Sequence, residues 1–281
     1  MLQVNVALPS GKRKHLAVPE SSKVRDLQVL AQESFGLRFL RLVNVQGQAF
    51  KDPTKTLQIV GIEEGSDLTA VAQEERKLSA TAEAFALWYR GAHRIITWGN
   101  PVFGGNSSTV QEKLRNVQQV QAAASAFAAI LADGSVVTWG NPYGGGDSSA
   151  MQNQLCSVQQ VQSTEYAFAA ILADASVITW GNPVFGGDIS AVQDELRNVQ
   201  QLQATAGAFA AILADGSVVT WGDPQRGGDS SKVQEQLRNV RQVQGTDFAF
   251  AAILADGSVV TWGHPEFGGD SSAVQEKLHL F

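Results

Sequence analysis

A stretch of 41 residues recurs five times in the C-terminal part of the chain, and this period constrains the fold more than any other feature of the sequence. A tryptophan marks the same point in every copy, and the five are Trp98, Trp139, Trp180, Trp221 and Trp262. A period between about 20 and 50 residues is typical of solenoids and propellers. We therefore expect residues 77–281 to form an array of five units. Their predicted boundaries are 77–117, 118–158, 159–199, 200–240 and 241–281.

Each unit is predicted to contain three short strands and one short helix. The strand-like segments of the fourth unit are 199–205, 209–214 and 217–221. Asp215-Gly216 is typical of a tight turn, and Ala175, which replaces the turn glycine in the third unit, should cost about 1 kcal/mol if its φ is positive. Beyond a Pro- and Gly-rich loop, a Ser precedes a Gln by three residues, as Ser231 precedes Gln234. This capping-box pattern predicts a helix of roughly two to three turns.

A unit of this size cannot bury its own apolar faces, so neighbouring units must stack. We expect a mainly-β domain with a propeller-like arrangement, with an open arc or a β-solenoid as the alternatives. Residues 208–222 resemble the repeat of the regulator of chromosome condensation family. The short period is closer to β-lactamase inhibitor protein II, a propeller with three-stranded blades in the same superfamily. The resemblance implies the fold, and it also allows the function of an exchange factor or an enzyme inhibitor.

Residues 1–72 follow a different pattern, which predicts a separate α+β domain. Apolar residues alternate as in strands, then recur at helical spacing up to a glycine, and alternate again. The predicted elements are strands at 2–8 and 16–18, a helix at 24–35, and strands at 40–45 and 67–71.

The order and spacing of these elements resemble ubiquitin. The residues that carry the resemblance are Arg41, Leu42, Val43, Gly47, Leu57, Gly61, Ile62 and Leu68. It implies a ubiquitin-like β-grasp domain at 1–72 and a linker at 73–76. It also implies a patch that contacts partner proteins, at the positions Leu8, Val43 and Val71. The alternative is that Leu8 and Val71 belong to the core of the sheet.

The continuation of the chain departs from ubiquitin. A conjugated modifier ends in Gly-Gly, whereas Val71 is followed here by Ala-Gln-Glu-Glu-Arg. The resemblance therefore implies an integral docking module rather than a transferable tag. Its expected partners are a ubiquitin receptor, the proteasome or components of a ubiquitin ligase.

Chemistry-bearing motifs are scarce. The sequence has no phosphate-binding loop, no His-Glu-x-x-His and no nucleophile beside a His, and its four His residues share no repeat position. Cys156 is the only cysteine, and the net charge of -6 gives no electrostatic reason to expect nucleic acid or an anionic membrane as partner. We expect no catalytic residues, cofactor or metal. Without a signal-peptide pattern or a long apolar run, we expect an intracellular protein, cytoplasmic or nuclear.

Comparing the units with one another separates a nearly constant framework from two variable segments. One segment lies just before the second strand and the other follows the proline after the Trp. Variable loops on a rigid scaffold are the usual layout of a recognition surface, and neutral variation among duplicated units is the alternative. The candidate protein-binding residues are Glu83, Ser125, Glu165, Tyr166, Asp247 and Phe248 in the first segment, and Phe103, Tyr143, Phe185, Arg226 and Phe267 in the second.

These observations favour a non-enzymatic adaptor linked to the ubiquitin pathway, in which both domains bind proteins. Repeats of this kind also occur in large HECT-type ubiquitin ligases, but the catalytic HECT domain has no counterpart in the sequence. The alternatives are an exchange factor or enzyme inhibitor, and a purely structural array.

Overall fold

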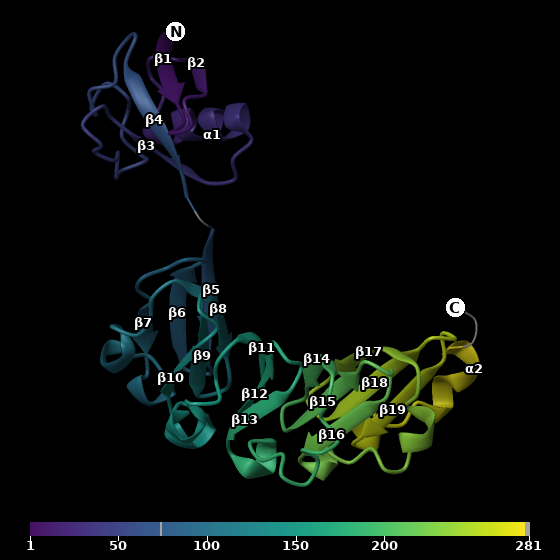
Figure 1. The fold of residues 1–281 in the computed structure, drawn as a ribbon. Helices are drawn as coiled ribbons and strands as arrows, with labels where there is room; N and C mark the ends of the chain where they lie inside the picture. The colour runs from purple at the N-terminus through teal and green to yellow at the C-terminus, as the bar shows by residue number, and fades with distance from the viewer. Residues whose placement is uncertain (74, 279–281) are drawn as a thin grey trace. The chain divides into compact units, whose positions relative to one another are not determined.

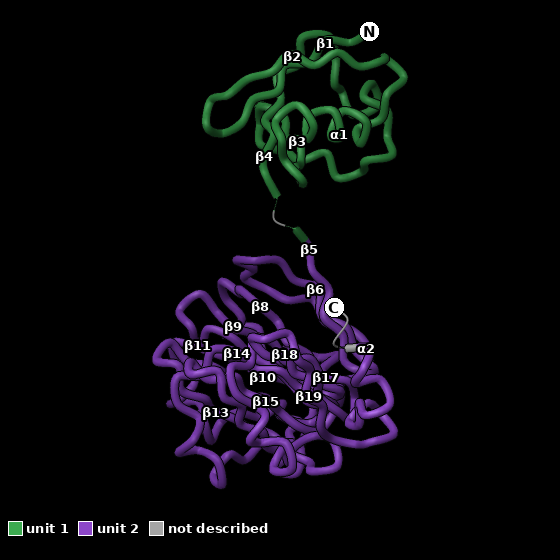
Figure 2. The backbone as a smooth tube through the Cα atoms, turned by 90° about the vertical axis from the view of Figure 1, so that its right-hand side faces the viewer, with its two compact units in different colours: residues 1–75 green, residues 76–281 purple. Residues whose placement is uncertain are grey.

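The computed structural model describes residues 1–73 and 75–278. The chain divides into two compact units, residues 1–75 and 76–281, which Figure 2 colours separately. The predicted linker at 73–76 includes Glu74, which lies outside the described residues. Its last residue, Arg76, is the first residue of strand β5, so the second unit begins inside the segment expected to be a linker.

The first unit is a four-stranded sheet packed against one helix (Figure 1). The strand order is β2-β1-β4-β3, with β1 parallel to β4 and both outer strands antiparallel to their neighbours. One face of the sheet and the apolar side of the helix form the core, to which Val6, Leu42 and Leu27 contribute. The elements are β1 (Leu2–Ala7), β2 (Arg13–Val18), α1 (Val24–Phe35), β3 (Leu40–Val43) and β4 (Asp67–Ala72).

The second unit consists of five three-stranded antiparallel sheets, one for each repeat. Each sheet from the second onward begins one residue earlier than the predicted boundary, as Val117 shows for 118–158. The strands are β5 (Arg76–Ala80), β6 (Ala84–Tyr89), β7 (Ile96–Gly99), β8 (Val117–Ala122), β9 (Ala126–Leu131), β10 (Val136–Gly140), β11 (Val158–Ser163), β12 (Ala167–Leu172), β13 (Val177–Gly181), β14 (Val199–Ala204), β15 (Ala208–Leu213), β16 (Val218–Gly222), β17 (Val240–Gly245), β18 (Ala249–Leu254) and β19 (Val259–Gly263).

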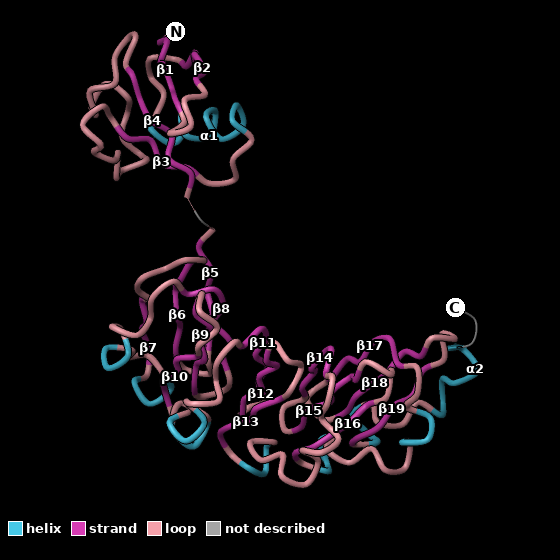
Figure 3. Tube along the Cα trace, in the orientation of Figure 1, coloured by secondary structure: helices cyan, strands magenta, loops and turns pink. Residues whose placement is uncertain are grey.

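The expected helix of two to three turns is wrong, because short 3-10 turns stand in its place (Figure 3). The glutamine does not cap a helix. Gln152 Nε2 donates instead to the carbonyl of Val136 at 3.0 Å, and Gln111 and Gln234 make the equivalent bonds. The helical elements are η1 (Pro101–Phe103), η2 (Ser108–Val110), η3 (Pro142–Gly144), η4 (Ser149–Met151), η5 (Pro183–Phe185), η6 (Pro224–Arg226), η7 (Gln234–Gln236), η8 (Pro265–Phe267), η9 (Ser272–Val274) and the four-residue α2 (Gln275–Leu278).

The repeated tryptophan ties each unit to the one before it. Trp139 stacks on Phe127 with a centroid distance of 5.1 Å, and its Nε1 donates to the carbonyl of Gly104 in the preceding unit at 3.1 Å. A Cβ on Gly104 would lie 2.6 Å from the Phe127 ring, so the close approach requires glycine. We name this contact the Phe–Trp junction. It recurs where Trp180 meets Gly145, where Trp221 meets Gly186 and where Trp262 meets Gly227.

A ladder of backbone hydrogen bonds follows the same direction. Ala82 N donates to Ala124 O, Ala124 N to Glu165 O, Glu165 N to Ala206 O, and Ala206 N to Asp247 O, at 2.9 to 3.1 Å. These bonds join the turns between the first two strands of consecutive sheets. They fix the spacing of the units without involving any side chain.

The array is open rather than a closed ring. In Figure 1 the sheet β5–β6–β7 lies at one end of the second unit and the sheet β17–β18–β19 at the other. The principal contacts between sheets join consecutive ones, as between β14 and β17. The mainly-β, propeller-like stacking of three-stranded sheets agrees with the expectation, and the array is arranged as the open arc given as an alternative, without closing into a ring. Within the described part of the chain, no helix has the length and apolar character needed to cross a membrane.

Candidate functional site

The two variable segments of each repeat meet at one edge of the sheets. In the third unit, Thr164 lies in the turn before the second strand, and its Oγ1 donates to the carbonyl of Phe185 in the loop after the Trp, at 3.0 Å. Thr81, Thr205 and Thr246 make the equivalent bond in their own units. The turn and the loop are thus held together, and their variable side chains lie at the same edge of the sheet.

Aromatic side chains from the two segments touch in the third and fifth units. Tyr166 meets Phe185 edge to face, with ring centroids 4.9 Å apart. Phe248 lies against Phe267 with centroids 4.8 Å apart, and His264 contacts both rings. Such pairs gain about 0.5–1.5 kcal/mol beyond the burial of their surface, so these side chains hold one another in place.

Arg226 of the fourth unit joins the two aromatic pairs. Its guanidinium lies 5.6 Å from the centre of the Phe185 ring and 4.9 Å from that of Phe248, within the range of cation–π attraction. Its Nη1 lies 3.1 Å from a carboxylate oxygen of Glu165, and its Nε lies 3.6 Å from Asp223. The turn position of the fourth unit is Gly207, where a Cβ would lie 2.6 Å from the Arg226 side chain. Glycine therefore makes room for the long side chain.

Together these residues form a continuous row over the third, fourth and fifth units. We call Tyr166, Phe185, Arg226, Phe248 and Phe267 the aromatic–arginine row. Tyr166 and Phe267 are exposed, and the other three are half-buried. The row is thus accessible along its length while its side chains are fixed by contacts with one another.

The other candidates of the two segments lie elsewhere. Ser125 is buried, and an added Cβ on Gly144 would overlap its hydroxyl, so its side chain offers little surface to a partner. Glu83 is exposed and accepts a hydrogen bond from Asn100 Nδ2 at 2.7 Å. Phe103 is half-buried and packs against the core between the first two repeats. Tyr143 is 84% exposed but lies in the second repeat, outside the row.

Of the charged candidates, Glu165 is half-buried and paired with Arg226, whereas Asp247 is exposed. Sequence reasoning missed the threonine that clamps turn to loop and also Asp223, whose side chain accepts from Gln225 N at 2.9 Å. Both could have been found, because a Thr precedes the variable position in four of the five units and an Asn or Asp precedes the loop proline in four.

The patch expected in the N-terminal domain, residues 1–75, is only partly assembled. Val43 and Val71 lie on the same face of the sheet, since Val43 pairs with Thr69 and Val71 with Arg41 in the register of β3 and β4. Val43, however, is buried, so it offers little surface to a partner. Leu8 is half-buried and packs against the core cluster, which agrees with the alternative that it serves the core.

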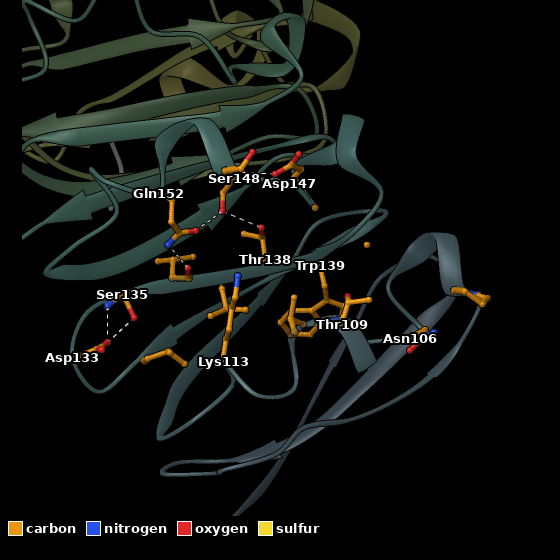
Figure 4. A pocket seen from close by; sticks show the side chains of 18 residues that line it. Asn106, Thr109, Lys113, Asp133, Ser135, Thr138, Trp139, Asp147, Ser148 and Gln152 are labelled. Carbon is orange, nitrogen blue, oxygen red and sulfur yellow. Dashed lines mark hydrogen bonds between the residues drawn. The ribbon is translucent and has the colours of Figure 1, made fainter.

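A cleft of about 680 Å³ lies between the loop of the first repeat and the sheet of the second (Figure 4). Its carboxylates and the side chains of Thr138, Ser148 and Gln152 are held in hydrogen bonds. Ser148 Oγ lies 3.0 Å from Thr138 Oγ1 and donates to Gln152, while Asp133 accepts from the hydroxyl and backbone N–H of Ser135. The side-chain hydrogen bond from Ser135, followed by the backbone one, lowers the pKa of Asp133. The cleft therefore presents structural carboxylates rather than a reactive pair.

The aspartates in the loops after each Trp are equally structural. Asp147 accepts from Ser149 N at 2.9 Å, and this bond, together with one from the Ser149 side chain, lowers the pKa of Asp147. Asp188, Asp229 and Asp270 repeat the arrangement, each with a lowered pKa. Across residues 1–73 and 75–278, no group of three or more His, Cys, Asp or Glu is placed to hold a metal ion.

No protein-family model matches the sequence, and no curated protein matches it. Among solved structures, the CRINKLY WD40 ectodomain of the Arabidopsis thaliana receptor kinase ACR4 is similar at 16% identity, with a TM-score of 0.44, over 68% of this chain and 64% of that one. Yeast RCC1 (Prp20), in a complex with Kap60, is similar at 16% identity and a TM-score of 0.45, over 68% and 56%. The ectodomain of the Physcomitrella patens receptor kinase CR4 is similar at 15% identity and a TM-score of 0.45, over 69% of this chain and 53% of that one.

The matches thus span between 53% and 64% of the length of these three structures. They report that the chain has neighbours among RCC1 and WD40-like β-repeat proteins, and they assign it neither a family nor an activity.

Proposed function

We propose that the protein is a non-enzymatic adaptor, in which the aromatic–arginine row binds a segment of another protein. The observation that carries this proposal is the continuity of the row over three units, with aromatic side chains and an arginine still accessible. Tyr, Trp and Arg are the residue types that dominate binding energy at protein interfaces, and anchors that are already fixed lose little entropy on binding.

The charges around the row indicate what kind of segment fits. The guanidinium of Arg226 is already balanced by Glu165 and Asp223. Asp247 and Glu266 are exposed next to Phe248 and Phe267 in the sequence. A partner segment with apolar side chains and nearby Lys or Arg would therefore meet rings and complementary charge.

The proposal that no reaction is catalysed is supported by the bonding of the polar groups described above. In the cleft of Figure 4, the carboxylates of Asp133 and Asp147 accept hydrogen bonds from Ser135 and Ser149, and the hydroxyls of Thr138 and Ser148 bond to each other. A general base or nucleophile must instead be free to exchange a proton or to attack.

We further propose that residues 1–75 form a ubiquitin-like docking module for a ubiquitin receptor, the proteasome or a ligase component. The strand order β2-β1-β4-β3, with β1 parallel to β4 and one helix across the sheet, supports this proposal. Of the expected patch, Val71 is half-buried on the face opposite the core, whereas Leu8 packs against the core cluster.

Quantitative affinity capture with the full chain tests both proposals. Tyr166→Ala and Phe267→Ala should each lose one set of proteins, and Val71→Asp should lose a separate set that contains ubiquitin-pathway proteins. Tyr143→Ala is the matched control, because this tyrosine is more exposed than Tyr166 but lies outside the row.

Unchanged recovery by both row variants would contradict binding through the row and favour a purely structural array. Recovery of ubiquitin-pathway proteins that is unaffected by Val71→Asp would count against the docking module alone. The thermal unfolding of each variant, followed by tryptophan fluorescence, shows whether the repeat domain is still folded.

A further inference from the structure

The first repeat exposes an apolar face that every later repeat buries. Phe85 stacks on Trp98 with a centroid distance of 5.3 Å, the same arrangement as in the Phe–Trp junctions. Both side chains are 45% exposed, whereas Phe127 and Trp139, at the equivalent positions of the second repeat, are 0% and 3% exposed. Within residues 1–73 and 75–278 the indole N–H of Trp98 has no acceptor, whereas those of the four later tryptophans each have a glycine carbonyl.

More apolar side chains extend this face. In the register of the sheet, Phe85 pairs with Trp98, Leu87 with Ile96, and Leu78 with Leu87, so all five point to the same side. Leu78 and Ile96 are exposed as well. We call these five residues the open first face. The residues that precede it, 1–75, contain no further copy of the repeat.

The fifth repeat carries the complementary surface. Gly268 occupies the position of the glycines that accept the tryptophan N–H, but a Cβ added there meets nothing within 4 Å. At Gly104, by comparison, the added Cβ would lie 2.6 Å from a phenylalanine ring. Ile253 is 42% exposed, whereas Ile212, at the same position one repeat earlier, is 5% exposed and packs in the core shared with the fifth repeat.

The backbone ladder is also unfinished at both ends. Ala82 N and Asp247 O are used by the ladder within the chain. The next bond on one side would need a donor for Ala82 O, and on the other an acceptor for Asp247 N. One end of the array therefore offers the group that the other end lacks.

The charges of the two end repeats are opposite. Residues 76–116 contain six Lys or Arg and two Glu, a net charge of +4, and residues 240–278 contain two Lys or Arg and five Asp or Glu, a net charge of -3. Opposite charges steer two surfaces together and disfavour contacts between like ends.

We propose that copies of this chain associate head to tail, with the fifth repeat of one copy covering the open first face of the next. The contact repeats the Phe–Trp junction between chains. The Trp98 indole donates to the Gly268 carbonyl of the neighbouring copy, and Phe85 packs on Gly268. Because the surfaces that meet are different, the contact is heterologous, and it produces rings or linear chains of copies rather than a twofold dimer.

Sedimentation of the full chain over a range of concentrations and salt tests this inference. We expect species larger than the monomer that dissociate as salt is raised. Ile96→Glu should weaken association about tenfold or more, because it removes an apolar contact and adds repulsion from the acidic fifth repeat. Ile253→Lys should do the same at the other end. Ile59→Glu, at an exposed isoleucine of the N-terminal domain (residues 1–75), is the matched control and should leave association unchanged.

Mixing the two variants gives the sharpest result. Ile96→Glu keeps a good fifth repeat, and Ile253→Lys keeps a good first face, so a mixture should form one-to-one dimers although each variant alone is monomeric. A wild-type chain that stays monomeric at every concentration would overturn the proposal, and so would a mixture without dimers. A monomer in which residues 1–75 cover the open first face belongs to the first of these outcomes.

Discussion

Ala175 is the residue whose replacement should stabilise the repeat domain most simply. It has φ 65°, as expected for a turn position where Gly134, Gly216 and Gly257 have φ of 78°, 79° and 86°. An L-residue in this region costs roughly 1–2 kcal/mol, while a glycine makes the unfolded chain more flexible by about 0.4–1 kcal/mol. The difference predicts that Ala175→Gly raises the free energy of unfolding by about 0.5–1 kcal/mol, because the relief of strain exceeds the added entropy.

Urea denaturation followed by tryptophan fluorescence measures this change in the repeat domain alone, because all six tryptophans lie in residues 76–281. Two reverse variants separate strain from overlap. A Cβ at Gly257 meets nothing within 4 Å, whereas at Gly134 it would lie 2.7 Å from Ser157 Cα. Gly257→Ala should therefore destabilise by strain alone, and Gly134→Ala by more. A lower or unchanged midpoint for Ala175→Gly would refute the reasoning.

The remaining predictions concern the junctions and the loop aspartates. Trp180→Phe should lower the free energy of unfolding by about 0.5–1.5 kcal/mol through loss of its hydrogen bond, whereas Trp98→Phe, whose indole donates to no described residue, should change it little in denaturant titrations. Gly145→Ala should destabilise more than Gly268→Ala in thermal unfolding, because only the former places a Cβ 2.5 Å from a phenylalanine ring. Lowered aspartate pKa values contribute stability that is present above the unfolded pKa of about 3.9 and is lost as pH falls through the folded values, so stability should fall below about pH 4. Asparagine already fills this position at Asn106, where it accepts from Ser108 N at 3.0 Å, so amide substitution should flatten this decline at little cost at neutral pH. The variant for that measurement is Asp147→Asn, Asp188→Asn, Asp229→Asn and Asp270→Asn combined.

Sequence periodicity predicted the five three-stranded units because strand alternation and the 41-residue interval are local signals. The helix was predicted wrongly because a capping box fixes only where a helix would begin. Here Gln152 bonds to the neighbouring strand, and Ser157, with φ 56°, turns the chain into the next sheet before a helix can extend. Closure of the ring depends on small rotations between units, which no residue pattern in one unit encodes.

The candidate site was also predicted only in part, because the residue pattern of one repeat does not encode its contacts with the next. Variation between repeats located the two segments, but it could not show that Arg226 reaches from the fourth unit to Glu165 and Phe185 in the third and to Phe248 in the fifth. Nor could it show that Ser125 is buried, since its exposure depends on how closely the loop of its own unit approaches.

The backbone ladder has a consequence for how such a chain can change. The bonds that set the spacing of the units come from the peptide groups of Ala124, Glu165, Ala206 and their equivalents, so they exclude only proline, which has no N–H, at these positions. The edge that holds the units together can therefore accept new residues without loosening the array. A library randomised at these turns, or a chain with its units in a different order, would present new surfaces on an unchanged support.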